Sequence, residues 1–254
     1  MIGVFDSGLG GLSIWQQVRA ALPCESIVYY GDGANCPYGG RTEDEVTQLT
    51  MAGVEFLIEK KGAKLVVIAC NTATATAIDA VRARWPGVPI VGMLPAIKPA
   101  ALSTRTGVVA ILGTERSLCS EKLRQYTEEF AAGVEVISAV GTGFVELVER
   151  DMEGTPEALG AVRAVVEPLV ARGADMLVLG CTHYPFLADE IRRVIAGREV
   201  EIIDPAPAIA RRVAQLLAEH KLAADDSHEP EYEFYTLAGG EYLQKMKRKT
   251  EVMR

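Results

Sequence analysis

Several features are missing from this chain, and each absence excludes a class of protein. There is no run of about 20 apolar residues, so the sequence predicts no membrane-spanning helix. The segment after Met1 lacks a basic region followed by an apolar stretch and a small-residue cleavage site, so we expect no secretory signal. Basic residues are outnumbered 26 to 34, and the net charge of −8 argues against nucleic acid or an anionic membrane as the main partner.

Cysteine is also scarce. The chain has five cysteines, and none of them forms a Cys-x-x-Cys pair. An odd number of cysteines without a signal sequence predicts reduced thiols and a cytoplasmic location. The spacing does not suit a zinc site, so we predict no metal. The rest of the composition is that of an ordinary globular protein, with 49% hydrophobic and 24% charged residues. The length of 254 residues allows one large or two modest domains.

Apolar runs and helical patterns alternate from end to end. This alternation predicts βαβ units and mostly parallel sheets flanked by helices. Prolines interrupt the pattern near 94–98 and again near 205–207. The expected strands are Met1–Phe5, Ser26–Tyr30, Lys64–Ala69, Pro89–Gly92, Gly107–Leu112, Val134–Ser138, Asp175–Gly180, Val200–Ile203 and Tyr232–Tyr235. The expected helices include Thr42–Lys60, Thr72–Trp85, Glu115–Phe130, Pro156–Arg172, Pro185–Ala196 and Glu241–Lys249.

Two stretches, Lys61–Thr72 and Arg172–His183, read almost alike, and each leads to a cysteine. In both, a Gly-Ala pair leads into an apolar run, and the run ends at a cysteine followed by small polar residues. Such a run predicts a buried parallel strand, which places Cys70 and Cys181 at carboxyl ends of strands, where these sheets build their sites. Two equivalent thiols from two similar halves could face each other across a cleft, a geometry that suits a two-base reaction on a chiral carbon.

The residues after each cysteine support this interpretation. Asn71 and Thr72 open a helix, whose free N–H groups and positive dipole end favour a carboxylate and lower a nearby thiol pKa. His183 lies two residues after Cys181 and could accept or return the proton of that thiol. Taken singly, each feature also fits a structural role, because buried cysteines, helix caps and satisfied polar side chains are common.

Other strand ends carry polar residues as well. The first expected strand leads into Asp6-Ser7-Gly8-Leu9-Gly10-Gly11, which is either a ligand loop or a tight turn capped by aspartate; it is not a dinucleotide fingerprint, because position 13 is Ser. In the next loop, Tyr38 could cover a substrate, and we expect Arg41 to pair with Asp32. Thr114 and Ser117 could bind a carboxylate or cap a helix.

Taken together, these motifs resemble those of the glutamate racemases, cofactor-independent enzymes that supply D-glutamate for peptidoglycan. The resemblance implies two pseudosymmetric α/β domains, each a mostly parallel sheet flanked by helices, with the active site in the cleft between them. The first domain would comprise 1–94 plus 206–254 and the second 95–205. It also implies glutamate as substrate, no cofactor and, as in many members, a homodimer. It rests on Phe5–Gly11, Pro37–Arg41, Ala69–Ala73, Pro95–Ala100 and Gly180–Pro185.

The resemblance also assigns roles. Cys70 and Cys181 would be the two acid/base thiols, assisted by Asp6 and His183 respectively, while Glu149 matches an auxiliary acidic residue of some members. Ser117 stands where the family usually has Thr, and Gly141-Thr142 replaces a Cys-Pro-like pair. The implied substrate-contacting positions are Ser7, Pro37, Tyr38, Gly39, Asn71, Thr72, Thr114, Ser117 and Thr182.

Three alternatives remain open. Aspartate racemases resemble the chain in fold but usually show Cys-Thr-Glu at the second thiol, where this chain has Cys-Thr-His. Arylmalonate decarboxylases keep one of the two cysteines. A non-catalytic protein could use the same cleft only to hold an acidic ligand.

Overall fold

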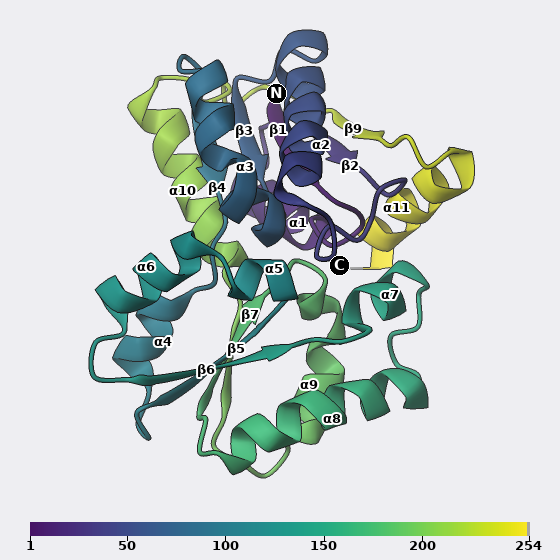
Figure 1. Ribbon diagram of the computed structural model, residues 1–254. Helices are drawn as coiled ribbons and strands as arrows, with labels where there is room; N and C mark the ends of the chain where they lie inside the picture. The colour runs from purple at the N-terminus through teal and green to yellow at the C-terminus, as the bar shows by residue number, and fades with distance from the viewer. Residues whose placement is uncertain (253–254) are drawn as a thin grey trace. The chain divides into compact units, whose positions relative to one another are not determined.

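The computed structural model describes residues 1–252, which form two compact units (Figure 1). Unit 1 contains Met1–Met93 and the chain from Ala206 onwards, and unit 2 contains Leu94–Pro205. Each unit has one sheet in which every strand pair is parallel, with helices beside it. The prediction of two parallel α/β sheets flanked by helices is therefore confirmed.

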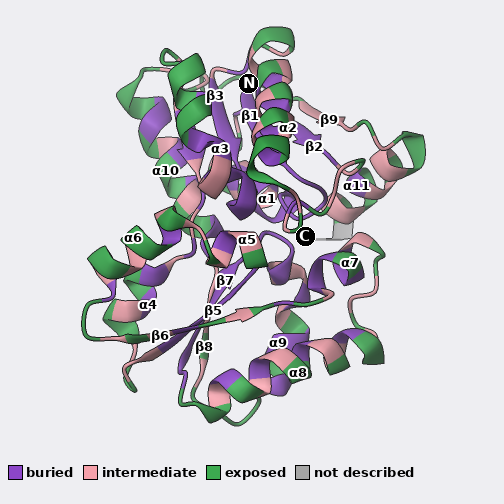
Figure 2. Ribbon diagram, in the orientation of Figure 1, coloured by how far each residue is buried: buried purple, intermediate pink, exposed green. Residues whose placement is uncertain are grey.

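The sheet of unit 1 has five strands in the order β4-β3-β1-β2-β9. The strands β1, β2 and β3 are buried along their whole length (Figure 2), as expected for apolar runs covered on both faces. Helices α2 and α3 pack together on one face, and α1 and α10 pack together on the other. The strands are β1 (Ile2–Asp6), β2 (Ile27–Gly31), β3 (Leu65–Ile68), β4 (Ile90–Gly92) and β9 (Tyr232–Tyr235). The helices are α1 (Leu12–Ala21), α2 (Glu43–Glu55) with its π-helical end η1 (Phe56–Lys60), α3 (Asn71–Arg84), α10 (Ala206–Glu219) and α11 (Gly240–Val252).

The sheet of unit 2 has four strands in the order β6-β5-β7-β8. Helices α4 and α6 pack together, as do α8 and α9, and Figure 1 shows the two pairs on opposite faces of the sheet. The strands are β5 (Val108–Gly113), β6 (Glu135–Val140), β7 (Met176–Gly180) and β8 (Glu201–Ile203). The helices are α4 (Ile97–Ser103), α5 (Glu115–Leu118), α6 (Glu121–Phe130), α7 (Phe144–Glu149), α8 (Pro156–Ala171), the 3₁₀ turn η2 (Tyr184–Leu187) and α9 (Ala188–Val194).

The two sheets share one topology. In unit 1 the first strand, β1, lies between β2 and β3, and in unit 2 the first strand, β5, lies between β6 and β7. The fourth strand of each unit, β4 or β8, extends the sheet beyond its third strand. The sequence repeat therefore corresponds to a structural one, because the two cysteine-terminated runs are the third strands, β3 and β7, of the two sheets.

Two local expectations need correction. The Pro95–Pro99 region is not irregular throughout, because α4 begins at Ile97 and holds Pro99 in its first turn, where a missing N–H costs little. The segment Glu115–Phe130 is two helices, since Ser120 accepts a hydrogen bond from the Leu123 N–H and starts α6 afresh. The expected break at 205–207 coincides with the boundary between the units, which falls between Pro205 and Ala206, where α10 begins. Within residues 1–252, no helix combines the length and apolar character needed to cross a membrane.

Candidate active site

Each sheet has a switch point where the strand order reverses, between β1 and β3 in unit 1 and between β5 and β7 in unit 2. In open parallel sheets, ligands bind outside the carboxyl ends of the strands at such a point. Asp6 ends β1, and Cys70 follows β3 on the neighbouring strand. Thr114 follows β5, and Cys181 follows β7. The topology therefore places one thiol at the switch point of each unit.

Cys70 is the N-cap residue of α3 and is only 5% exposed. Its Sγ accepts a hydrogen bond from the Ala73 backbone N–H at 3.5 Å. The thiol therefore lies at the positive end of a helix of 14 residues, and both the dipole and this N–H favour the thiolate form. These are the conditions in which a cysteine can act as a base.

Asp6 lies beside Cys70 because β1 and β3 are paired neighbours, with the Ala69 N–H donating to the Phe5 carbonyl at 2.8 Å. The Asp6 side chain is fully buried, and its Oδ1 accepts the Gly8 N–H at 2.9 Å. Ser7, between them, is also buried. The Asp6–Gly8 turn thus places a buried carboxylate next to the thiol.

Asn71 and Thr72, in the first turn of α3, are both buried. The Asn71 Nδ2 group donates to the Met93 carbonyl at 3.4 Å. Its Oδ1 has no hydrogen-bond partner among the residues that the structure describes. A buried acceptor without a partner is costly, so this oxygen is suited to a donor on a ligand.

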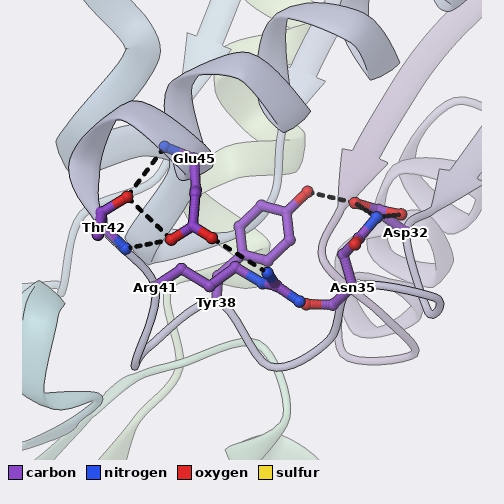
Figure 3. A network of polar contacts seen from close by, with 6 residues as sticks. All are labelled: Asp32, Asn35, Tyr38, Arg41, Thr42 and Glu45. Carbon is purple, nitrogen blue, oxygen red and sulfur yellow. Dashed lines mark hydrogen bonds and ion pairs between the residues drawn. The ribbon is translucent and has the colours of Figure 1, made fainter.

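The loop after β2 forms a polar network around Asp32 (Figure 3). The Tyr38 hydroxyl donates to Asp32 Oδ2 at 2.6 Å, and the Asn35 amide donates to both carboxylate oxygens at 3.0 and 3.1 Å. Burial raises the pKa of the Asp32 carboxyl despite these hydrogen bonds. Burial and the hydrogen bond to Asp32 also raise the pKa of Tyr38, with smaller contributions from the charges of Cys70 and Asp6. Tyr38 is therefore a neutral phenol held close to Cys70.

Arg41 lies close enough for its charge to lower the pKa of the Asp32 carboxyl, but the expected direct ion pair between them is not among the contacts of the described residues. The Arg41 Nε group donates to the Asn35 carbonyl at 2.7 Å, and one terminal nitrogen lies 3.8 Å from the Glu45 carboxylate (Figure 3). The oxygens of Asp32 are already engaged by Tyr38 and Asn35, which explains the difference. The predicted substrate positions in this loop differ in burial: Tyr38 is buried, Gly39 is partly buried and Pro37 is exposed.

In unit 2, three side chains form two successive polar contacts. Cys181 Sγ lies 3.8 Å from His183 Nδ1, and His183 Nε2 lies 2.8 Å from Glu149 Oε1. Because an ionised carboxylate only accepts, Nε2 is the donor to Glu149, and in the neutral imidazole the lone pair of Nδ1 then faces the thiol. His183 can therefore take the Cys181 proton while Glu149 stabilises the imidazolium that forms. Cys181 itself is 8% exposed.

Around this thiol, Thr182 is buried, and Tyr184 donates its hydroxyl to the Gly113 carbonyl at 3.0 Å. Thr114 and Ser117 form a reciprocal cap on α5, in which each side chain binds the other residue's backbone N–H, at 3.1 and 3.4 Å. The capping role that the sequence allowed for these hydroxyls is therefore observed. Their capping contacts also fix the position of the backbone at the end of β5.

The Glu149–His183 contact could not be predicted from spacing. The two residues are 34 positions apart, and no local motif connects the end of α7 with the turn after β7. Only the family resemblance pointed to Glu149. The hydroxyls of Tyr29 and Tyr184, which bind the Gly8 and Gly113 carbonyls, were not anticipated either.

Known proteins share this organisation. The Asp/Glu/Hydantoin racemase family matches residues 12–213. A glutamate racemase of Roseiflexus sp. (strain RS-1) is 47% identical over 221 residues, covering 87% of this chain and 80% of that protein. One from Herpetosiphon aurantiacus is 39% identical over 251 residues, covering 99% and 98%. The crystal structure of Escherichia coli glutamate racemase, in complex with L-glutamate and the activator UDP-MurNAc-Ala, is 32% identical, has a TM-score of 0.86 and covers 98% of this chain and 94% of that one.

The relatives are similar along almost the whole chain, and the E. coli enzyme agrees with it in fold across both units. The chain therefore belongs to the Asp/Glu/Hydantoin racemase family and, within it, to the glutamate racemases.

Proposed function

We propose that this protein interconverts L- and D-glutamate by proton transfer at the α-carbon, with Cys70 and Cys181 as the two acid/base groups. One observation is the main support for the proposal. In each unit, the third strand of the sheet leads to a buried cysteine at the switch point. The relatives that match most of the chain are named glutamate racemases, which supports glutamate as the substrate. In this proposal each unit supplies one thiol.

In one direction, the Cys70 thiolate removes the α-proton, and the Cys181 thiol delivers a proton to the opposite face of the carbon. In the other direction the roles exchange. The C–H bond breaks heterolytically, its electron pair spreads into the α-carboxylate, and a new C–H bond forms on the other side. No electron leaves or enters, so the reaction needs neither an oxidant nor a reductant.

The two thiols are prepared in different ways. Cys70 has the α3 N-terminus, the Ala73 N–H and the neighbouring Asp6. Cys181 has His183, oriented by Glu149, as a proton acceptor at 3.8 Å. We propose catalytic roles for Asp6 and His183 on this basis, since a positioned acid or base contributes about 10²–10⁴ in rate.

Stabilising the carbanion requires donors aimed at the substrate and exclusion of water. We propose that buried polar groups at the strand ends provide these contacts. The open Oδ1 acceptor of Asn71 suits the substrate ammonium, and the backbone N–H groups of the strand-end turns suit its carboxylates. The proposed contact residues are Ser7, Pro37, Tyr38, Gly39, Asn71, Thr72, Thr114, Ser117 and Thr182.

We also propose that the enzyme acts in the cytoplasm, without a cofactor, as a homodimer, and that its D-glutamate enters peptidoglycan synthesis. The odd number of cysteines supports a reducing compartment. Light scattering on the purified protein would determine the assembly, and a mass of one chain would exclude the dimer.

The test of function is to incubate the purified protein with L-glutamate in D2O, without added pyridoxal phosphate or metal. We expect optical activity to disappear while deuterium replaces the α-proton. Activity on aspartate or an arylmalonate instead of glutamate would reassign the substrate. No turnover of any of them, with glutamate still bound, would favour the binding-protein alternative.

A further inference from the structure

The hydroxyl of Tyr29 is a buried polar group with no role in the reaction proposed above. Tyr29 lies in the middle of β2, and its side chain is fully buried. Its hydroxyl donates to the Gly8 carbonyl at 2.6 Å. The ring packs against Phe234 of β9, with 6.3 Å between ring centroids, so the hydroxyl has a fixed direction.

Gly8 links this hydroxyl to Asp6. Its carbonyl accepts from Tyr29, while its N–H donates to Asp6 Oδ1 at 2.9 Å. Both polar groups of one glycine are therefore fixed, one by the core of the sheet and one by the carboxylate next to Cys70. The N–H and the carbonyl belong to the two peptide units that meet at the Gly8 Cα, so a shift of the carbonyl would change the direction of the N–H that binds Asp6.

The surrounding space leaves the turn little freedom. A Cβ added to Gly11 would lie 2.5 Å from the Asp6 Cβ and 2.9 Å from the Tyr29 hydroxyl oxygen. A Cβ added to Gly31 would lie 2.8 Å from the Gly8 carbonyl oxygen. The absence of side chains at these two glycines lets the backbone approach Asp6, Tyr29 and Gly8 closely.

We propose that Tyr29 is a positioning residue for the Cys70 half-reaction: it holds Gly8 so that Asp6 keeps the orientation in which it assists Cys70. This inference rests on the proposed function. It predicts that loss of the hydroxyl slows proton transfer at Cys70 and leaves transfer at Cys181 unchanged. Hydrogen bonds that orient a carboxylate rather than touch the substrate affect the rate more than substrate binding.

The test is Tyr29→Phe, with Tyr30→Phe as a matched control. Tyr30 follows on the same strand, points to the opposite face and stacks on Phe5. We expect Tyr29→Phe to lower kcat about tenfold with little change in KM, as for one lost hydrogen bond to a positioned group. Tyr30→Phe should match the wild type.

The decisive readout is the primary isotope effect with the two 2-deuterated enantiomers of glutamate. Each enantiomer presents its α-deuterium to a different thiol. If Tyr29 acts through Asp6, the isotope effect rises for the enantiomer deprotonated by Cys70 and falls for the other, because only one transfer has slowed. Equal changes for both enantiomers, or no loss of kcat, would overturn the inference.

Two further variants test the same inference. In an Asp6→Asn background, Tyr29→Phe should have little additional effect, whereas an additive loss would contradict a route through Asp6. If Tyr29→Phe does not fold, Gly11→Ala, whose added methyl group would press on both Asp6 and the Tyr29 hydroxyl, should produce the same divergence of isotope effects. A wild-type protein that fails to racemise glutamate would refute the proposed function. A racemising wild type with a symmetric Tyr29→Phe effect would refute only the role of Tyr29.

Discussion

Single residues at the two strand ends surround the two cysteine sulfurs with different groups. Cys70 is the N-cap of α3, with a backbone N–H directed at its sulfur. Cys181 precedes only the short 3₁₀ turn η2. Its sulfur faces the imidazole of His183, which is hydrogen-bonded to the Glu149 carboxylate. The sequence repeat thus conserves the position of the sulfur while the groups that assist it differ. A substitution in one half should therefore affect one proton transfer more than the other.

Glu149→Gln tests the assisting carboxylate in unit 2. The amide oxygen can still accept the Nε2–H of His183, but it no longer stabilises the imidazolium by charge. We expect kcat to fall about tenfold, the value of a charge-assisted hydrogen bond reduced to a neutral one, with KM little changed. Steady-state kinetics would measure this. Glu146→Gln, an exposed change on the same helix, should behave like the wild type, and a similar loss there would assign the effect to α7 as a whole.

Asp32→Asn tests the buried carboxylate behind Tyr38. Because burial raises the folded-state pKa of Asp32, the folded state binds more protons than the unfolded state between the two pKa values. The contribution of Asp32 to stability is therefore complete at low pH and is lost as the pH rises through its folded-state pKa. We expect the stability of Asp32→Asn relative to the wild type to increase from about pH 4 towards neutrality. Urea denaturation at several pH values would measure this, and a difference independent of pH would contradict it.

At the scale of elements, the contact between α2 and β1 depends on Gly53. A Cβ at this position would lie 2.3 and 2.5 Å from atoms of the Phe5 ring, which belongs to the core of unit 1. Replacing glycine by alanine normally stabilises a helix by about 1 kcal/mol. Here the clash should outweigh that gain, so we expect Gly53→Ala to destabilise the protein by about 1–3 kcal/mol.

Gly160→Ala in α8 is the matched control. A Cβ there would meet nothing within 4 Å, so the normal helix propensity should apply and raise the free energy of unfolding by about 0.5–1 kcal/mol. Thermal or urea denaturation would compare the two variants. If both variants were more stable than the wild type, the α2–β1 contact would have adapted to the added methyl group.

The strands β1, β2, β3 and β7 were predictable from the sequence because their apolar runs are buried along their whole length, and each lies within a residue of its expected range. Helix boundaries were harder to predict, because side-chain caps such as Ser120 decide where a helix restarts. The least predictable features were contacts between distant segments. The bond from Glu149 to His183, and the engagement of Asp32 by Tyr38 instead of Arg41, depend on tertiary packing that local spacing does not record.

At the scale of the whole molecule, unit 2 is one continuous segment with its own sheet and its own core. The core includes Ile97 of α4, Ile111 of β5, Leu123 of α6 and Val178 of β7. We expect residues 94–205, expressed alone, to unfold cooperatively, because they bury a sheet between helices on both faces. Circular dichroism on heating would measure this. A gradual, non-cooperative loss of signal would show that unit 2 depends on unit 1 to fold.

The central claim is that both units contribute a thiol to one reaction. It is tested most directly by Cys70→Ala and Cys181→Ala, with the exposed Cys119→Ala as the control, each assayed for racemisation and for glutamate binding by calorimetry. We predict that each buried-cysteine variant loses racemisation by about a thousandfold or more while still binding glutamate, and that Cys119→Ala stays fully active. Turnover close to that of the wild type in either Cys70→Ala or Cys181→Ala would contradict the two-thiol mechanism.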